Sequence, residues 1–227
     1  NSSTLPNIVL YEFLHERDLL KATQKAELIK NMIAGKTLLI KKNYNTVTGG
    51  FGLWSPKSTS VFHTALILGL FGKMNKFVSV PDKIINAACS YLEKHQKQDG
   101  SFACSAGSYT PFPSLLSDEA TSIYVAQSLA LAGKLNDKLV SWIVSNVESY
   151  VSDVSLASMA LEALACAGLV QKYKDVANQL RDSIVSSHCE TGGWESTSVA
   201  LTHGKESIET TAYAIVALNK AFPDKST

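Results

Sequence analysis

Apolar side chains recur along most of the chain at intervals of three and four residues, which places them on one face of an α-helix. Leu10, Phe13 and Leu14 follow this spacing near the N-terminus. The strict alternation that is typical of strands is scarce, and proline and glycine stand where the helical runs begin or end. The pattern predicts nine helices with the approximate bounds 6–16, 22–41, 59–73, 81–97, 118–133, 136–150, 153–168, 171–187 and 207–221.

A second pattern is a turn between helical segments that combines glycine with an aromatic residue. It reads Gly-Gly-Phe at 49–51, Asp-Gly-Ser-Phe at 99–102 and Gly-Gly-Trp at 192–194. The first two copies lie about fifty residues apart, which is the length of a helical hairpin with its loop. Glycine permits a tight turn, and the aromatic ring can reach under the helix ends. We therefore predict that Phe51, Phe102 and Trp194 are buried structural residues and not a ligand-binding surface.

Several helical segments carry small residues on more than one face, as 155–165 does with alanine and serine. Small residues suit an inner helix that packs on both sides. Inner helices that alternate with amphipathic outer ones predict an all-α fold, an α/α toroid of two concentric helical rings. The length of 227 residues and a hydrophobic share of 45% favour one domain that spans residues 1–227.

Charge, hydropathy and cysteine content exclude several classes of function. Twenty-one Lys and Arg stand against 20 Asp and Glu, so a protein that coats nucleic acid is not expected. The apolar run 64–71 is too short for a membrane span. Four cysteines form no C-x-x-C pair, which leaves disulfides open and argues against a structural zinc site. The glycosylation match at 1–3 suits a secreted protein.

Three stretches carry a resemblance to a known family. Residues 5–14, LPNIVLYEFL, resemble a helix "APNIYVLDYL"; residues 60–68, SVFHTALIL, resemble "STWLTAFVL"; residues 208–214, IETTAYA, resemble "VETTAYALL". The turn at 97–102 is similar to the "Q-x-x-x-G-x-F" hairpin of the same family. In order and spacing the chain resembles, over nearly its whole length, the thioester domain of the α-macroglobulin and complement proteins.

The resemblance implies a thioester chemistry that this chain does not carry. In the family, a Cys-Gly-Glu-Gln segment forms an internal thioester, an acyl group open to nucleophilic attack. None of the four cysteines is followed by Gly-Glu-Gln. By the match the segment would lie just before residue 1, or the full protein lacks it, so no thioester residue is assigned here. The family domain has about six helix pairs, so we expect an incomplete ring.

Some family members place a histidine after the second glycine-aromatic turn, where it speeds acyl transfer to hydroxyls. The corresponding loop, 103–113, contains no histidine, and Thr110 lies nearest by spacing. Hydroxyl-directed transfer by that mechanism is not expected.

Other candidate sites are better explained as structure. His63 lies on an apolar helix and is expected to be a satisfied core histidine. His188, Cys189 and Glu190 are adjacent in sequence but lack a further metal ligand. A prenyltransferase zinc site would need Asp182, Cys189 and His203 as ligands, but the sequence around these residues does not resemble that family. The acidic D-D-x-x-D cluster of terpenoid cyclases is also absent from the sequence. We predict no catalytic residue, no metal and no cofactor.

The function that follows is that of a non-enzymatic segment of a secreted, extracellular macroglobulin-like or complement-like protein. It would serve protease trapping or innate immune recognition through surface contacts with a protease, an immune receptor or a pathogen surface, and with other domains of its parent. Two alternatives remain open: a toroid enzyme of the isoprenoid class (terpenoid cyclase or prenyltransferase) and a small-ligand carrier. An acid-lined or zinc-bearing cavity would favour the enzyme, and a filled centre would favour the macroglobulin assignment.

Overall fold

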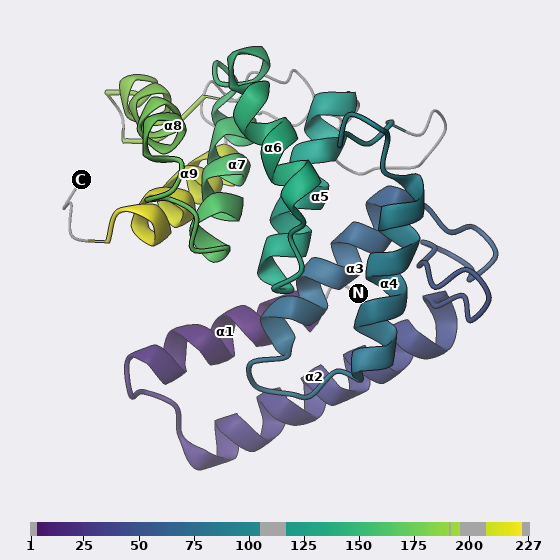
Figure 1. Ribbon diagram of the computed structural model, residues 1–227. Coiled ribbons are helices and arrows are strands. Elements are labelled where there is room, and N and C mark those ends of the chain that lie inside the picture. The colour runs from purple at the N-terminus through teal and green to yellow at the C-terminus, as the bar shows by residue number, and fades with distance from the viewer. Residues whose placement is uncertain (1–3, 105–116, 191, 196–207, 224–227) are drawn as a thin grey trace. The chain divides into compact units, whose positions relative to one another are not determined.

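The computed structural model describes residues 4–104, 117–190, 192–195 and 208–223, and this part of the chain is all-α. It contains nine α-helices and one short 3-10 helix, and no β-strand (Figure 1). The chain divides into two compact units, residues 1–94 and 95–227. The prediction that residues 1–227 form one domain stays a prediction.

The first unit is built from α1 (Thr4–Glu16), α2 (Ala22–Asn43), α3 (Val61–Met74) and α4 (Asp82–His95), whose last residue lies in the second unit. Helix α3 is buried on most of its surface, with ten of its 14 residues inaccessible, because its residues are small or apolar on every face. Helix α4 buries one face only. Helices α1 and α2 approach closely at Gly35, where an added Cβ would collide with the Thr4 side chain.

The second unit contains α5 (Asp118–Leu131), α6 (Asp137–Ser145), the 3-10 helix η2 (Val147–Ser149), α7 (Val154–Cys166), α8 (Lys174–Ser186) and α9 (Ile208–Ala221). Helix α7 lies at its centre and packs against α5, α8 and α9 (Figure 1). Helices α5 and α7 are buried almost all round, as their alanine and serine content predicts. Helices α6 and α8 bury a single apolar face.

Short polar side chains begin the buried helices. Ser60, Ser117 and Asp153 each accept a hydrogen bond from a main-chain N–H in the first turn of α3, α5 and α7. Such N-caps satisfy donors that have no partner within the helix. They fix where each inner helix starts, and so where the preceding turn must end.

The predicted bounds agree with the observed ones to within about three residues, except in one segment. The range 136–150 was predicted as one helix, and this is wrong. Helix α6 ends at Ser145, and a separate 3-10 turn follows. At this break Asn146 donates to the Trp142 carbonyl with both its main-chain N–H and its side-chain amide, at 3.1 and 2.8 Å.

None of the helices in the described ranges is long and apolar enough to cross a membrane.

Candidate functional site

The three glycine-aromatic turns share one geometry. The side chains of Phe51, Phe102 and Trp194 are 0%, 0% and 6% exposed. Each aromatic residue forms an isolated antiparallel bridge with a residue six or seven positions earlier, just after the end of α2, α4 or α8: Tyr44, Gln96 and His188. The turn therefore folds back on the helix that precedes it. The structural role of the three rings stays a prediction, tested in the Discussion.

Glycine is required in these turns by backbone conformation and by space. Gly49 and Gly100 have φ angles of +81° and +100°, in the left-handed region that favours glycine. An added Cβ would lie 2.6 Å from the Ala87 carbonyl oxygen at the first position and 2.5 Å from that of Lys138 at the second. The first two turns thus press against the main chain of a neighbouring helix, whereas Gly192 in the third turn has a φ of +99° but open space around its Cβ position.

A hydroxyl on the following inner helix completes each turn, a feature that the sequence analysis missed. The main-chain N–H of the buried aromatic donates to this hydroxyl at 2.9, 2.8 and 3.1 Å in the three copies. The acceptors are Thr64, Ser122 and Thr211. They are the fourth or fifth residues of their helices, so a hydroxyl at this depth in the helix after each turn was the available signal.

Removing one such hydroxyl should destabilise the protein. In Ser122→Ala the Phe102 N–H loses its acceptor in a buried position, and we expect a loss of about 1 to 2 kcal/mol in the free energy of unfolding. Chemical denaturation measures it. Ser122→Thr keeps the hydroxyl, as the first copy does with Thr64, and should lose less stability than Ser122→Ala, with any loss coming from the methyl group added at a fully buried position. Equal losses in both variants would contradict the assigned hydrogen bond.

The fourth inner helix, α7, carries the hydroxyl without the turn. Ser158 stands fifth in α7, as Ser122 stands fifth in α5. The connection 146–153 contains no glycine. Among the described residues the buried Ser158 hydroxyl finds no hydrogen-bond partner, which agrees with the role of the hydroxyl in the other copies.

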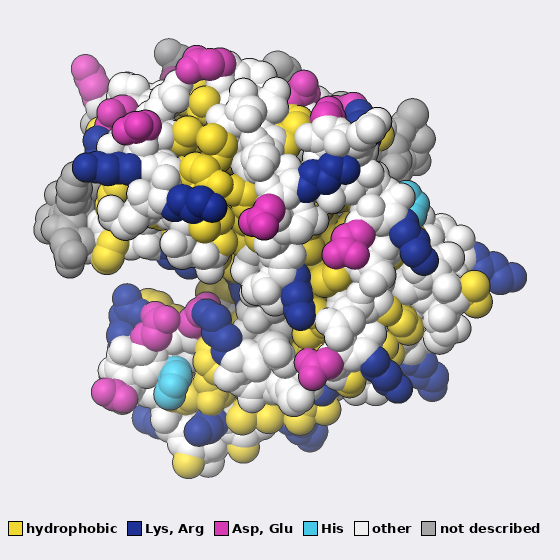
Figure 2. Space-filling view, in the orientation of Figure 1, with side chains coloured by type: hydrophobic (Ala, Val, Ile, Leu, Met, Phe, Trp, Pro, Cys, Tyr) yellow, Lys and Arg dark blue, Asp and Glu magenta, His cyan; other side chains and the backbone are white. Residues whose placement is uncertain are grey.

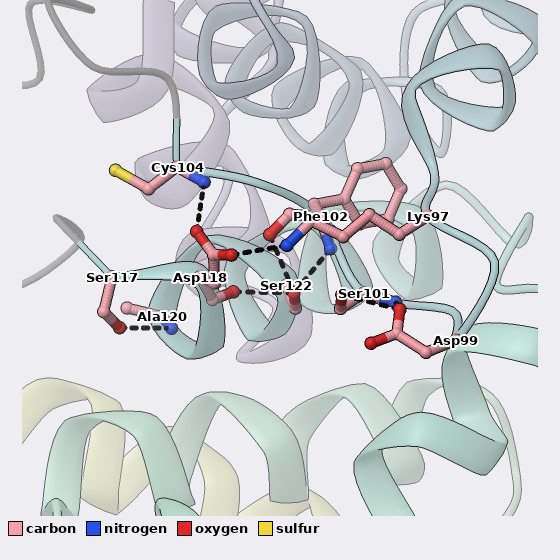
Figure 3. Close-up of polar contacts among 9 residues, drawn as sticks. All are labelled: Lys97, Asp99, Ser101, Phe102, Cys104, Ser117, Asp118, Ala120 and Ser122. Atoms are coloured by element: carbon pink, nitrogen blue, oxygen red, sulfur yellow. Dashed lines mark hydrogen bonds and ion pairs between the residues drawn. The ribbon is translucent and has the colours of Figure 1, made fainter.

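Asp118, the first residue of α5, joins the two ends of the segment 105–116 (Figure 3). One carboxylate oxygen accepts the Cys104 N–H at 2.7 Å, and the other pairs with the Lys97 ammonium at 2.5 Å. The neighbouring Asp99 accepts the N–H and hydroxyl of Ser101 at 2.9 and 2.7 Å. We call the contact among Lys97, Cys104 and Asp118 the Asp118 tie.

The Asp118 tie lies beside the loop in which the family places its histidine. Thr110, the position nearest to that histidine, falls outside the described residues. Cys104 and Asp118, which flank the loop, are held within one hydrogen bond of each other. Ser117 is the N-cap of α5, and this leaves the Asp118 carboxylate free to make the tie.

The Asp118 tie should weaken in acid. The hydrogen bond from Lys97, the Cys104 N–H and the Lys97 charge hold the pKa of Asp118 below its ordinary value of 3.8. A lowered folded-state pKa means that the contribution is fully present above the ordinary value and is lost as pH falls through the folded-state value. The Cys104 amide resonance, followed by NMR, should titrate with a midpoint below 3.8. Asp118→Asn should abolish that titration, and a midpoint above 3.8 would contradict the tie.

A buried polar centre joins the inner helices of the second unit. Glu162 of α7 is 2% exposed. One of its oxygens accepts from the Gln127 side-chain amide of α5 at 2.5 Å, and the other pairs with the Lys220 ammonium of α9 at 2.5 Å. Because both carboxylate oxygens are engaged within the protein, the arrangement is suited to holding three helices together and not to proton transfer. In the same unit, burial raises the pKa of Glu209.

His63 lies in the core of the first unit, 5% exposed. The Ser60 hydroxyl accepts the main-chain N–H of His63 and forms a second hydrogen bond, of 2.7 Å, with its Nδ1, in which the tautomer of the ring decides the donor. Burial lowers the pKa of His63 and favours the neutral ring. Its Nε2 has no partner in the described part of the chain, so the histidine expected to be satisfied is satisfied at one nitrogen only. A serine-histidine pair without an acid is no catalytic triad.

The other sequence candidates do not converge. His188 packs edge-on against Trp194, with ring centroids 4.8 Å apart, and the Cys189 N–H donates to the Gly193 carbonyl. Within the described ranges no three His, Cys, Asp or Glu side chains are placed to hold a metal ion. His203, the third member of the hypothetical zinc set, lies outside those ranges. All four cysteines are described, and none is in a disulfide.

A family model described as the A-macroglobulin TED domain, the thioester-containing domain, matches residues 2–225. A sequence search of curated proteins finds no match.

Proposed function

Because the chain belongs to the A-macroglobulin TED domain family, we propose that it is the thioester-domain segment of a secreted, extracellular macroglobulin-like or complement-like protein. In that role it acts without turnover, through surface contacts in protease trapping or innate immune recognition. Its partners are a protease, an immune receptor or a pathogen surface. The observation that carries this proposal is the family match over residues 2–225.

The proposed architecture is an incomplete α/α toroid within a single domain of residues 1–227. Helices α3, α5 and α7, which are buried on most faces, would form the inner ring, and α4, α6 and α8 the outer one. Two helices carry exposed apolar side chains that the described residues leave uncovered: Leu5, Val9, Leu10 and Phe13 in α1, and Ile208, Ile215 and Val216 in α9. Further helices of the parent protein would cover these faces.

A mass measurement tests the absence of acyl-transfer and cyclase chemistry. The chain contains no Cys-Gly-Glu-Gln, so methylamine should leave its mass unchanged and release no thiol beyond the four cysteines. Incubation with a prenyl diphosphate should give no product. Addition of methylamine or turnover of the diphosphate would contradict the proposal. For recognition, the labelled chain should compete with its protease-activated parent for deposition on bacterial cells or for retention of the protease.

A further inference from the structure

The loop between α2 and α3, residues 44–60, exposes two large apolar side chains. Val47 is 92% exposed and Trp54 is 82% exposed. The other two tryptophans, Trp142 and Trp194, are 8% and 6% exposed. Burying an indole is one of the larger gains available to a protein, so a tryptophan left in water on an ordered loop is a candidate contact residue.

Two asparagine side chains fix the loop that carries Val47 and Trp54. Asn45 accepts the N–H groups of Val47 and Thr48 at 2.9 and 3.0 Å and donates to the Pro56 carbonyl at 2.6 Å, so it joins two successive turns. Buried Asn43 donates to the carbonyls of Gly52 and Leu53 at 2.8 and 2.7 Å. The backbone on either side of Trp54 is therefore held before any partner arrives, which lowers the entropic cost of binding.

The sequence segment that contains this loop carries charge of one sign. Residues 28–81 contain seven lysines and no aspartate or glutamate. Exposed Lys41 and Lys42 precede the loop, and exposed Lys57 lies within it. Over residues 1–94, 12 Lys and Arg stand against six Asp and Glu, whereas residues 95–227 carry nine against 14. On the face shown in Figure 2, hydrophobic and basic side chains meet at the edge of the first unit.

We propose that Val47 and Trp54, with Lys41, Lys42 and Lys57, form a tip that docks on an anionic lipid bilayer. The indole would lie at the headgroup level, where tryptophan is enriched, and the lysines would pair with anionic headgroups. The two apolar side chains stand almost fully in solvent, so they project outward and do not line a flat patch. A stable protein interface needs about 800 Å² from each partner, whereas a fluid interface closes around a projecting side chain.

Tryptophan fluorescence of the chain 1–227 tests this proposal directly. Because Trp142 and Trp194 are already buried, a change in emission on binding reports on Trp54. Vesicles of phosphatidylcholine with phosphatidylserine should shift the emission to shorter wavelength, and brominated lipid should quench it. Phosphatidylcholine alone should give a weaker effect, and added salt should reduce binding. No shift with either vesicle would overturn the proposal.

Matched variants distinguish binding through the tip from binding through positive charge elsewhere on the protein. In vesicle sedimentation, Trp54→Ala should bind about tenfold more weakly, and Lys41→Gln/Lys42→Gln/Lys57→Gln should bind at least tenfold more weakly. The control Lys134→Gln/Lys172→Gln/Lys174→Gln makes the same charge change at exposed lysines of the second unit and should bind as the wild type does. Equal weakening by both triple variants would overturn the proposal, as would a Trp54→Ala variant that binds normally.

Two soluble ligands complete the test. Neither glycerophosphoserine nor heparin should shift the emission of Trp54. A shift with the first would assign the tip to a free headgroup, and a shift with the second would assign it to a sulfated glycan. Either result would overturn the bilayer as the occupant.

Discussion

Replacing Phe102 with alanine is expected to lower the free energy of unfolding by about 3 to 5 kcal/mol. The Phe102 ring is fully buried in the turn that leads to α5, so truncation removes its apolar area from the core and leaves a cavity. Neighbouring main chain has little freedom to close that cavity, because the Phe102 N–H is held by Ser122 and the Gly100 turn lies against Lys138.

Trp54→Ala is the matched control for Phe102→Ala, because both aromatic residues follow a glycine-containing loop. The Trp54 side chain is 82% exposed, so its loss should change the free energy of unfolding by about 0.5 kcal/mol or less. Denaturant titration of both variants decides the matter. An unchanged midpoint and slope for Phe102→Ala would reassign the buried aromatics as a binding surface.

Lys220→Met is expected to cost about 2 to 3 kcal/mol of stability, the second largest effect. It leaves the Glu162 carboxylate, with a side chain 3% exposed, without its cation. A buried charge that loses its partner typically costs about 3 to 5 kcal/mol. The expected value is lower because the Lys220 side chain is 38% exposed, and solvent screens the pair.

A second substitution tests this explanation. In the Lys220→Met background, Glu162→Gln removes the unpaired charge and keeps a side chain that can bond to Gln127, so it should recover part of the lost stability. Thermal or chemical unfolding of both variants gives the comparison. If Glu162→Gln lowered stability further in that background, the cost would come from packing and not from charge.

The helices that are buried on most faces could be predicted from the sequence, because such a helix must consist mainly of small and apolar residues. Segment 155–165 is rich in alanine and serine, and α7 is accordingly buried on most faces. The end of α6 could not be predicted in this way. The apolar spacing of 136–150 continues through Asn146, although α6 ends at Ser145.

The polar contacts of the candidate site could be predicted only in part. Glycine and aromatic residues are close in sequence within each turn, so the turns were visible as a repeat. Ser122 lies 20 residues after Phe102 and Lys220 lies 58 residues after Glu162, and one sequence does not reveal pairings over such distances. The same holds for Cys104 and Asp118, which come together because α5 starts beside the turn that precedes it.

The Asp118 tie brings Cys104 and Asp118 together, so the stretch of chain between them is closed at its base. In polymer terms, the entropy of closing a loop grows with the logarithm of its length, so each doubling costs only about 0.6 kcal/mol. By this argument, insertions or a grafted peptide between Cys104 and Asp118 should add little to the entropic cost of closing the tie.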